Sequence, residues 1–219
     1  MSQHPLEFKN LSIGYKKALS QSINLSVKEG QFVTIMGENG CGKTTLIDTM
    51  MGLNKVIEGS ITFWGRPHNS SNNLEVDKKI AWVISQKERY SPLLRIKDYL
   101  KVLSMAHEKW DQKLCDQLIE KFKVDVDKRM FHLSLGEHSK VRLLKALSSQ
   151  PQLLILDELT ANLSPQSKKV LTECLIDLFA KNKMSVLYIS HFEDEAMRLS
   201  DEVYVLDKDG LNKRGVQSA

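Results

Sequence analysis

The chain has 219 residues and a formal net charge of +4, from 31 Lys and Arg against 27 Asp and Glu. This length supports one large domain with a substantial core, and the scattered basic residues give little support for nucleic-acid binding. The three cysteines, Cys41, Cys115 and Cys174, lie far apart and suggest neither a disulfide framework nor a zinc site. No apolar run approaches the roughly 18 residues of a transmembrane helix, and no signal peptide is apparent, so we expect a soluble protein of a reducing cytosol.

The first third of the chain is rich in strand signals. Apolar and polar residues alternate, or apolar β-formers gather, in several short segments bounded by glycines and polar turns. We expect strands at 6–12, 23–27, 31–36, 59–65 and 79–84. The first two of these are expected to be antiparallel, and the polar residues 69–73 are expected to form a surface loop.

Helical periodicity then takes over. Apolar residues near 3.6-residue spacing predict helix over 96–122, and a second helix opens at about 133 and ends near Ser149. The continuous apolar run 153–157 is typical of a strand buried on both faces of a parallel sheet.

A further helix and strand follow. Ser164 and Pro165 resemble an N-cap followed by proline at the first helical position, and 186–189 predicts another buried strand. Strands and helices alternate as in a doubly wound α/β fold with an inserted helical lobe.

The segment from Gly37 to Thr44 fits the phosphate-binding pattern G-x-x-x-x-G-K-[ST] at every fixed position, between a predicted strand and a predicted helix. Glycines let successive N–H groups point inward, and the following helix adds its positive end. Lys43 is expected to contact the β- and γ-phosphates and Thr44 to ligate Mg²⁺. An ordinary glycine turn is the alternative. The candidate nucleotide-binding residues here are Gly37, Asn39, Gly40, Cys41, Gly42, Lys43, Thr44 and Thr45.

Two further sites lie where predicted buried strands end, the edge at which open α/β sheets bind ligands. Asp157 and Glu158 close the strand 153–157. Phosphoryl transfer to water needs a carboxylate for the metal and a group that positions the attacking water, and these two residues suit the two roles. His191 follows the last buried strand and could orient the water. A pair of exposed acids and a structural histidine are the alternatives.

In order and approximate spacing, these motifs together with Gln86 and the segment 133–137 resemble ABC-type ATPases, the nucleotide-binding subunits of ABC transporters. The resemblance covers nearly the whole chain. It implies a P-loop NTPase fold of class α/β, with a RecA-like core and antiparallel β region at about 1–88 and 150–219, and an inserted helical lobe at about 89–149. It also implies that two such domains pair head to tail around two ATP molecules.

The resemblance also assigns roles to residues outside the phosphate loop. Tyr15 matches the aromatic that stacks on adenine, although it could be an ordinary strand aromatic. Gln86 matches the glutamine that touches Mg²⁺ or water, although it could be a plain loop residue. Ser134 and Gly136 match the signature positions that contact the γ-phosphate of the opposite subunit's ATP.

The chain departs from the family pattern at several positions. The signature, usually Leu-Ser-Gly-Gly-Gln, has Leu135 and Glu137 at its third and fifth positions. Glu137 places a negative charge near the expected triphosphate, and similar substitutions resemble those of small bacterial exporter subunits. The proline expected after the catalytic glutamate is Leu159, and the final aspartate of the D-loop is Ser164, which keeps the capping ability without the charge.

The resemblance implies an ATPase that binds ATP and Mg²⁺, forms a dimer and powers a separate transmembrane permease at the inner face of the cell membrane. Residues 89–94 would meet that permease, although a solvated loop is the alternative. The absence of an appended regulatory domain, together with Trp110 and Asp111, favours an exporter. No nucleic-acid partner is expected.

Two other functions are alternatives to a transporter subunit. A soluble ABC ATPase acting as a mechanical switch usually carries two ATPase domains or a long coiled-coil insertion. A small-molecule kinase would not need residues 134–136 or the adjacent Asp157 and Glu158.

Overall fold

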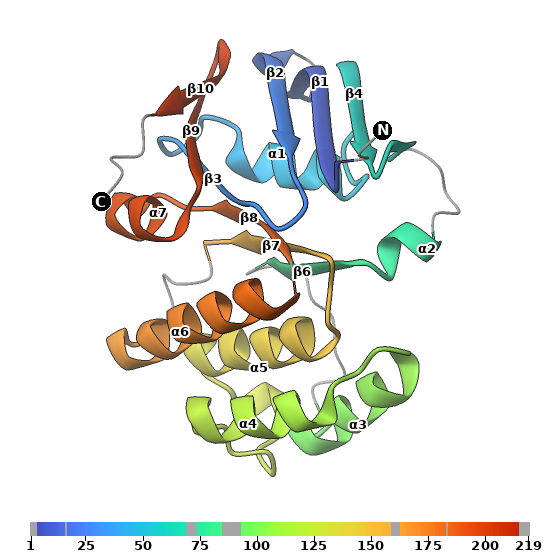
Figure 1. Cartoon of the computed structure of the whole chain (residues 1–219), viewed down its shortest axis with the longest axis vertical. Coiled ribbons are helices and arrows are strands. Elements are labelled where there is room, and N and C mark those ends of the chain that lie inside the picture. Colours follow the sequence, from blue (N-terminus) through green and yellow to red (C-terminus); the bar gives the residue numbers. More distant parts are fainter. Residues whose placement is uncertain are drawn as a thin grey trace. The chain divides into compact units, whose positions relative to one another are not determined.

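The computed structural model of the protein describes residues 4–15, 17–68, 74–84, 93–158, 163–182 and 184–214 (Figure 1). The chain forms two compact units, Met1–Asp77 with Lys183–Ala219, and Lys78–Asn182. The second unit holds most of the expected helical lobe together with two strands and one more helix. The predicted lobe boundaries near 88 and 150 therefore stay a prediction.

The first unit contains an antiparallel sheet in the order β2-β1-β4-β5. Its strands are β1 (Leu6–Gly14), β2 (Ala18–Val27), β4 (Glu58–Phe63) and β5 (Arg66–Pro67). Phe8 pairs with Leu25 on one side and with Ile61 on the other, and all three side chains are buried. The predicted antiparallel pair is confirmed, and both strands run longer than the alternation indicated.

The first unit also contains the strands that hold the phosphate loop, in the order β10-β9-β3-β8. They are β3 (Phe32–Met36), β8 (Ser185–Ile189), β9 (Glu202–Asp207) and β10 (Gly210–Arg214). β3 is parallel to both β8 and β9, and β3 and β8 are buried throughout. Helix α1 (Lys43–Met50) contacts β1, and α7 (Glu193–Leu199) contacts β3; the short α2 (Leu74–Asp77) completes the unit.

The second unit pairs two parallel strands, β6 (Ile80–Ile84) and β7 (Leu153–Asp157), with a group of helices. The helices are α3 (Ile96–Ala106), α4 (Gln112–Phe122), the 3-10 turn Met130–His132, α5 (Leu135–Ser148) and α6 (Pro165–Asn182). Figure 1 shows them below the strands, in green to orange. α5 packs against α3, α4 and β6, so it forms the centre of this unit.

The helical signals predicted over 96–122 belong to two helices. α3 ends at Ala106, and α4 begins after Asp111, whose carboxylate accepts the N–H of Leu114 at 2.9 Å. An aspartate N-cap satisfies one of the amides that a helix start leaves without an intrahelical partner. Apolar spacing alone does not reveal such a break, because it continues on both sides.

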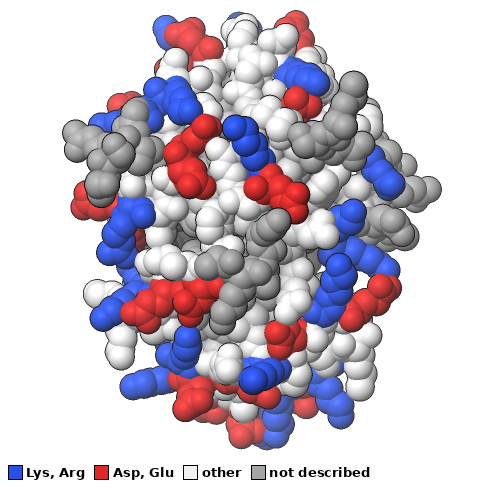
Figure 2. All heavy atoms as spheres, viewed as in Figure 1, with Lys and Arg blue, Asp and Glu red and all other residues white. Residues whose placement is uncertain are grey.

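The surface carries both signs of charge. On the face drawn in Figure 2, acidic and basic side chains lie interspersed, with no large area of one sign. Within the described ranges, none of the helices combines the length and hydropathy that crossing a bilayer requires.

Candidate functional site

The phosphate loop of the first unit has the predicted strand, loop and helix arrangement, since β3 ends at Met36 and α1 begins at Lys43. Gly40 and Gly42 have φ angles of 85° and 111°, a region that residues with a Cβ rarely adopt. A Cβ on Gly37 would lie 2.5 Å from Cys41 Sγ and 2.8 Å from the carbonyl oxygen of Leu206. The glycines therefore permit both the curvature of the loop and its close packing.

Lys43 is held inside this loop. Its side chain is only 7 % exposed, and its Nζ donates to the carbonyl oxygens of Gly37 at 2.7 Å and Glu38 at 3.0 Å. An ammonium has three donors, so it can hold the loop and also meet a phosphate oxygen. Thr44 is exposed in the first turn of α1, whereas Thr45 is 5 % exposed and its carbonyl accepts the hydroxyl of Thr49 at 2.7 Å.

Tyr15 directly follows β1, whose end packs near the phosphate loop. The strands on either side of Tyr15 approach Gly42. A Cβ placed on Gly42 would lie 3.5 Å from Cδ1 of Ile13 and 3.9 Å from Cβ of Leu19. The tip of the β1–β2 hairpin is thus a close neighbour of the loop. The ring of Tyr15 is 69 % exposed, which suits an aromatic that would stack on a base.

His191 reaches the same sheet edge as the phosphate loop. β8 pairs with β3 in parallel, Ile35 opposite Ile189, and the N–H of Ser190 donates to the carbonyl of Ile35 at 3.2 Å. The carboxyl ends of the two strands therefore lie side by side. His191 is exposed there, with its ring 4.0 Å from that of Phe192.

Asp157 and Glu158 lie at the corresponding edge of the second unit. Asp157 ends β7 opposite Ile84 of β6, and both carboxylate residues are half-buried. Glu158 has a φ angle of 44°, which is unusual for a residue with a long side chain. Such strain gathers at functional sites because the surrounding structure must impose it.

The signature segment, residues 133–137, forms the start of α5. Ser134 is the N-cap and makes a capping box with Glu137, while Leu135 is 69 % exposed. Glu137 also pairs with Lys128, at 2.8 Å between Oε1 and Nζ. The hydrogen bonds from Lys128 and Ser134 lower the pKa of Glu137 to about 2, so Glu137 is a carboxylate at neutral pH.

Comparison with known proteins decides the family. A family model described as ABC transporter matches residues 20–161, more than half of the chain. This chain belongs to the ABC transporter family. It is an ABC-type ATPase and an ATP-binding subunit of that family. The Nod factor export ATP-binding protein I of Burkholderia orbicola is 31 % identical over 95 % of the chain and 69 % of its own length.

Two further likenesses agree. The spermidine/putrescine import ATP-binding protein PotA of Spiroplasma citri is 30 % identical over 98 % of this ABC ATPase, which spans 62 % of the length of that relative. The solved structure of an ATP-binding subunit of an ABC transporter superimposes with a TM-score of 0.85 at 24 % identity, over 97 % of this chain and 90 % of the other, and shows the fold.

Some predicted residues of the ABC ATPase lie outside the described ranges. These are Gln86, most of the expected permease-docking segment 89–94, and Leu159. Ser164 is described, and its Oγ accepts the N–H of Ser167 at 3.2 Å, which confirms the predicted N-cap before Pro165.

The described residues fit the chemistry of ATP and Mg²⁺. Mg²⁺ is usually held by one or two protein oxygens together with substrate phosphates and water. Thr44 offers an exposed hydroxyl at the phosphate loop. Asp157 offers a carboxylate at a strand end.

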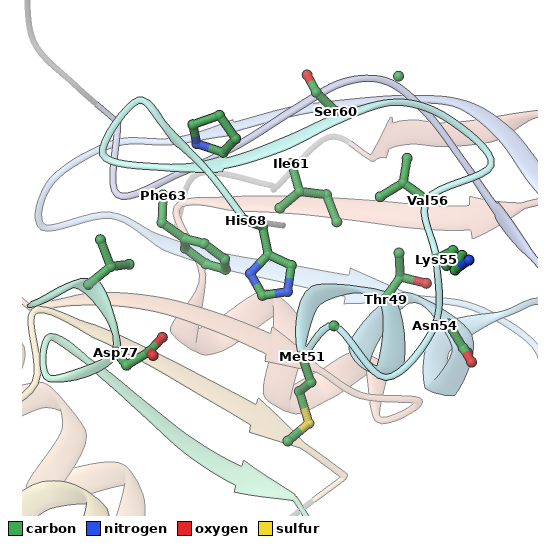
Figure 3. A pocket seen from close by; sticks show the side chains of 14 residues that line it. Thr49, Met51, Asn54, Lys55, Val56, Ser60, Ile61, Phe63, His68 and Asp77 are labelled. Atoms are coloured by element: carbon green, nitrogen blue, oxygen red, sulfur yellow. The ribbon is translucent and has the colours of Figure 1, made fainter. Parts of the chain in front are cut away.

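A separate cavity of about 700 Å³ lies in the first unit, away from the phosphate loop (Figure 3). Its wall includes Asn54, Phe63, His68 and Asp77, none of them a predicted site residue. The His68 ring meets that of Phe63 edge-on at 5.4 Å, and burial lowers the pKa of His68 while Asp77 opposes that shift. No sequence pattern signalled this cavity, because its wall comes from four separate elements.

Proposed function

We propose that this ABC ATPase powers a separate membrane permease by binding and hydrolysing ATP at its phosphate loop. The phosphate loop supports this most strongly. Gly40 and Gly42 have left-handed backbone conformations, and the Lys43 ammonium is hydrogen-bonded to the loop carbonyl of Gly37. The curved backbone and the start of α1 suit a polyphosphate. The Lys43 ammonium adds the positive charge that a γ-phosphate requires.

In this proposal the other site residues have distinct roles. As the family resemblance implies, Tyr15 would stack on the adenine, and Thr44, Asp157 and Gln86 would hold Mg²⁺. When bound, Mg²⁺ would neutralise charge on the phosphates. Glu158 accepts a proton from the attacking water and His191 orients that water near the γ-phosphate. The exposed position of His191 beside the phosphate loop supports its role.

The second ATP-contacting surface comes from a second copy of the chain. Ser134 and Gly136 at the start of α5 would contact the γ-phosphate held by that copy, as the family resemblance implies. The N–H groups of a helix start favour an anion, and Gly136 adds no side chain between them and the phosphate. The proposed assembly is a homodimer on the cytoplasmic face of the membrane.

The permease is proposed to meet the segment 89–94, where the side chain of Leu93 is 66 % exposed. We propose an exporter because of the Leu135 and Glu137 signature. Names among the relatives include both an import and an export protein, so direction needs its own test. Co-expression with a candidate permease and transport in membrane vesicles would decide it.

The central experiment measures the solution mass of the Glu158→Gln protein by light scattering, with and without Mg²⁺ and ATP. Blocked hydrolysis should trap the closed state, so ATP should double the mass while ADP should not. The matched control is Glu173→Gln, which removes an exposed carboxylate from α6. Bound ATP without dimer formation would contradict the homodimer.

A further inference from the structure

Glu137 is the part of the signature segment that conflicts with the proposed anion site. A carboxylate close to a triphosphate repels it, because both groups are negatively charged. The structure supplies a cation for this carboxylate. Lys128 Nζ lies 2.8 Å from Glu137 Oε1, with the two side chains 34 % and 36 % exposed.

The Ser134 hydroxyl is engaged with the same carboxylate. Its Oγ donates to Glu137 Oε2 at 2.9 Å and accepts the N–H of Glu137 at 3.3 Å, while the Ser134 N–H donates to Oε2 at 2.8 Å. A serine hydroxyl has a single proton. To donate to a phosphate oxygen, Ser134 must therefore turn this proton away from Glu137.

The main chain of Lys128 is fixed by two backbone hydrogen bonds, which place its side chain next to Glu137. Its carbonyl accepts the N–H of Ile96 at 3.1 Å, and its own N–H donates to Asp125 at 3.2 Å. The neighbouring cations Arg95 and Lys97 both pair with Asp127, at 3.4 Å and 2.6 Å. Among these described ion pairs, Lys128 is thus the cation assigned to Glu137.

We propose that Lys128 is a positioning residue of the signature site: it neutralises Glu137 and keeps its carboxylate in place while the Ser134 hydroxyl turns to the γ-phosphate of ATP bound by a second copy. The inference rests on the proposed function, since it deepens the role given there to Ser134. Lys128 binds Oε1 and Ser134 binds Oε2, so the carboxylate retains a cation after the hydroxyl has moved.

The test uses the full chain carrying Glu158→Gln, and measures the ATP concentration for half-maximal dimer formation. Lys128→Met should raise it by about tenfold, because the carboxylate would face the phosphate uncompensated. Adding Glu137→Gln should reverse most of this rise, since glutamine keeps the capping box without the charge. Lys128→Arg should stay close to the parent protein.

Two readouts separate positioning from folding. ATP affinity of the dilute monomer should change little in Lys128→Met, because the phosphate loop is untouched. Its melting temperature, which loss of the Lys128–Glu137 ion pair lowers, should stay well above the assay temperature. Lys113→Met, which removes an exposed lysine from α4, is the matched charge control and should leave dimer formation unchanged.

The outcomes are distinguishable. Suppose that the Glu158→Gln protein dimerises with ATP. If Lys128→Met then leaves the ATP concentration for half-maximal dimer formation unchanged, or if Glu137→Gln does not reverse its rise, the inference is wrong and the proposed function stands. If the parent binds ATP but never dimerises, the homodimer proposal fails and the inference fails with it.

Discussion

Helix α1 begins after a left-handed glycine, Gly42, with no side-chain cap, whereas α5 begins at a complete capping box between Ser134 and Glu137. Both starts belong to segments predicted to contact ATP. At α1 the cation is part of the motif, since Lys43 is the first helical residue. At α5 the cation is Lys128, outside the motif. A helix start without a side-chain cap can present its amide N–H groups directly to a ligand, whereas a capped start must first release them from the capping side chain.

The largest expected effect comes from a substitution that leaves both helix starts intact and removes the proposed catalytic base. Glu158→Gln should slow ATP hydrolysis by roughly 10²- to 10⁴-fold, the usual contribution of a positioned base, and should spare ATP binding. Phosphate release under saturating ATP measures this. If Glu158→Gln hydrolysed ATP at the wild-type rate, Glu158 would not be the base, and His191 would be the next candidate.

Lys43→Ala tests whether the start of α1 binds phosphate. Loss of a charge-assisted phosphate contact should weaken ATP binding by roughly 10- to 100-fold, measured by titration with a fluorescent ATP analogue. Lys55→Ala is the control, because it removes an exposed lysine that follows α1 in the same unit. Equal affinities for the two variants would contradict the phosphate-loop assignment.

Ser134→Ala tests the α5 side. It should leave ATP binding to the monomer unchanged and lower the free energy of unfolding by about 1 kcal/mol, the usual effect of losing a serine N-cap. Urea denaturation measures the loss. Ser104→Ala removes a hydroxyl that bonds within α3, at 2.8 Å to Lys101, and should cost less. If Ser134→Ala weakened the binding of ATP to the monomer, the assignment of Ser134 to the ATP held by a second copy would be contradicted.

The smallest expected effect is the pH dependence contributed by Glu137. Its pKa is lowered from 4.5 to about 2 by the hydrogen bonds from Lys128 and Ser134, so the ionised form stabilises the fold. That stabilisation is fully present above pH 4.5 and is lost as the pH falls toward 2. Glu137→Gln should therefore lose less stability than the wild type over this range, as measured by acid titration of the far-ultraviolet circular dichroism. Identical curves would contradict the ion pair.

The sequence predicted local features well and distant contacts poorly. The phosphate loop, the strand before it and the Ser164 cap were each readable within a few residues. The helical character of 96–122 was also readable, but the residues at which α3 ends and α4 begins were not. Met105, one of the apolar residues at helical spacing, is 76 % exposed. A run of apolar residues does not say where a helix ends, because the ending depends on a single capping side chain.

The residue pattern alone indicated the candidate site. It placed glycines at positions 40 and 42, where the backbone is left-handed, predicted Lys43 for phosphate, and put two acids at the end of a buried strand. The tertiary structure decided which groups meet. Parallel pairing of β3 with β8, and of β3 with β9, puts His191 at the same sheet edge as the phosphate loop. Local backbone preferences extend over a few residues, whereas these neighbours are fixed by packing between segments far apart in the chain.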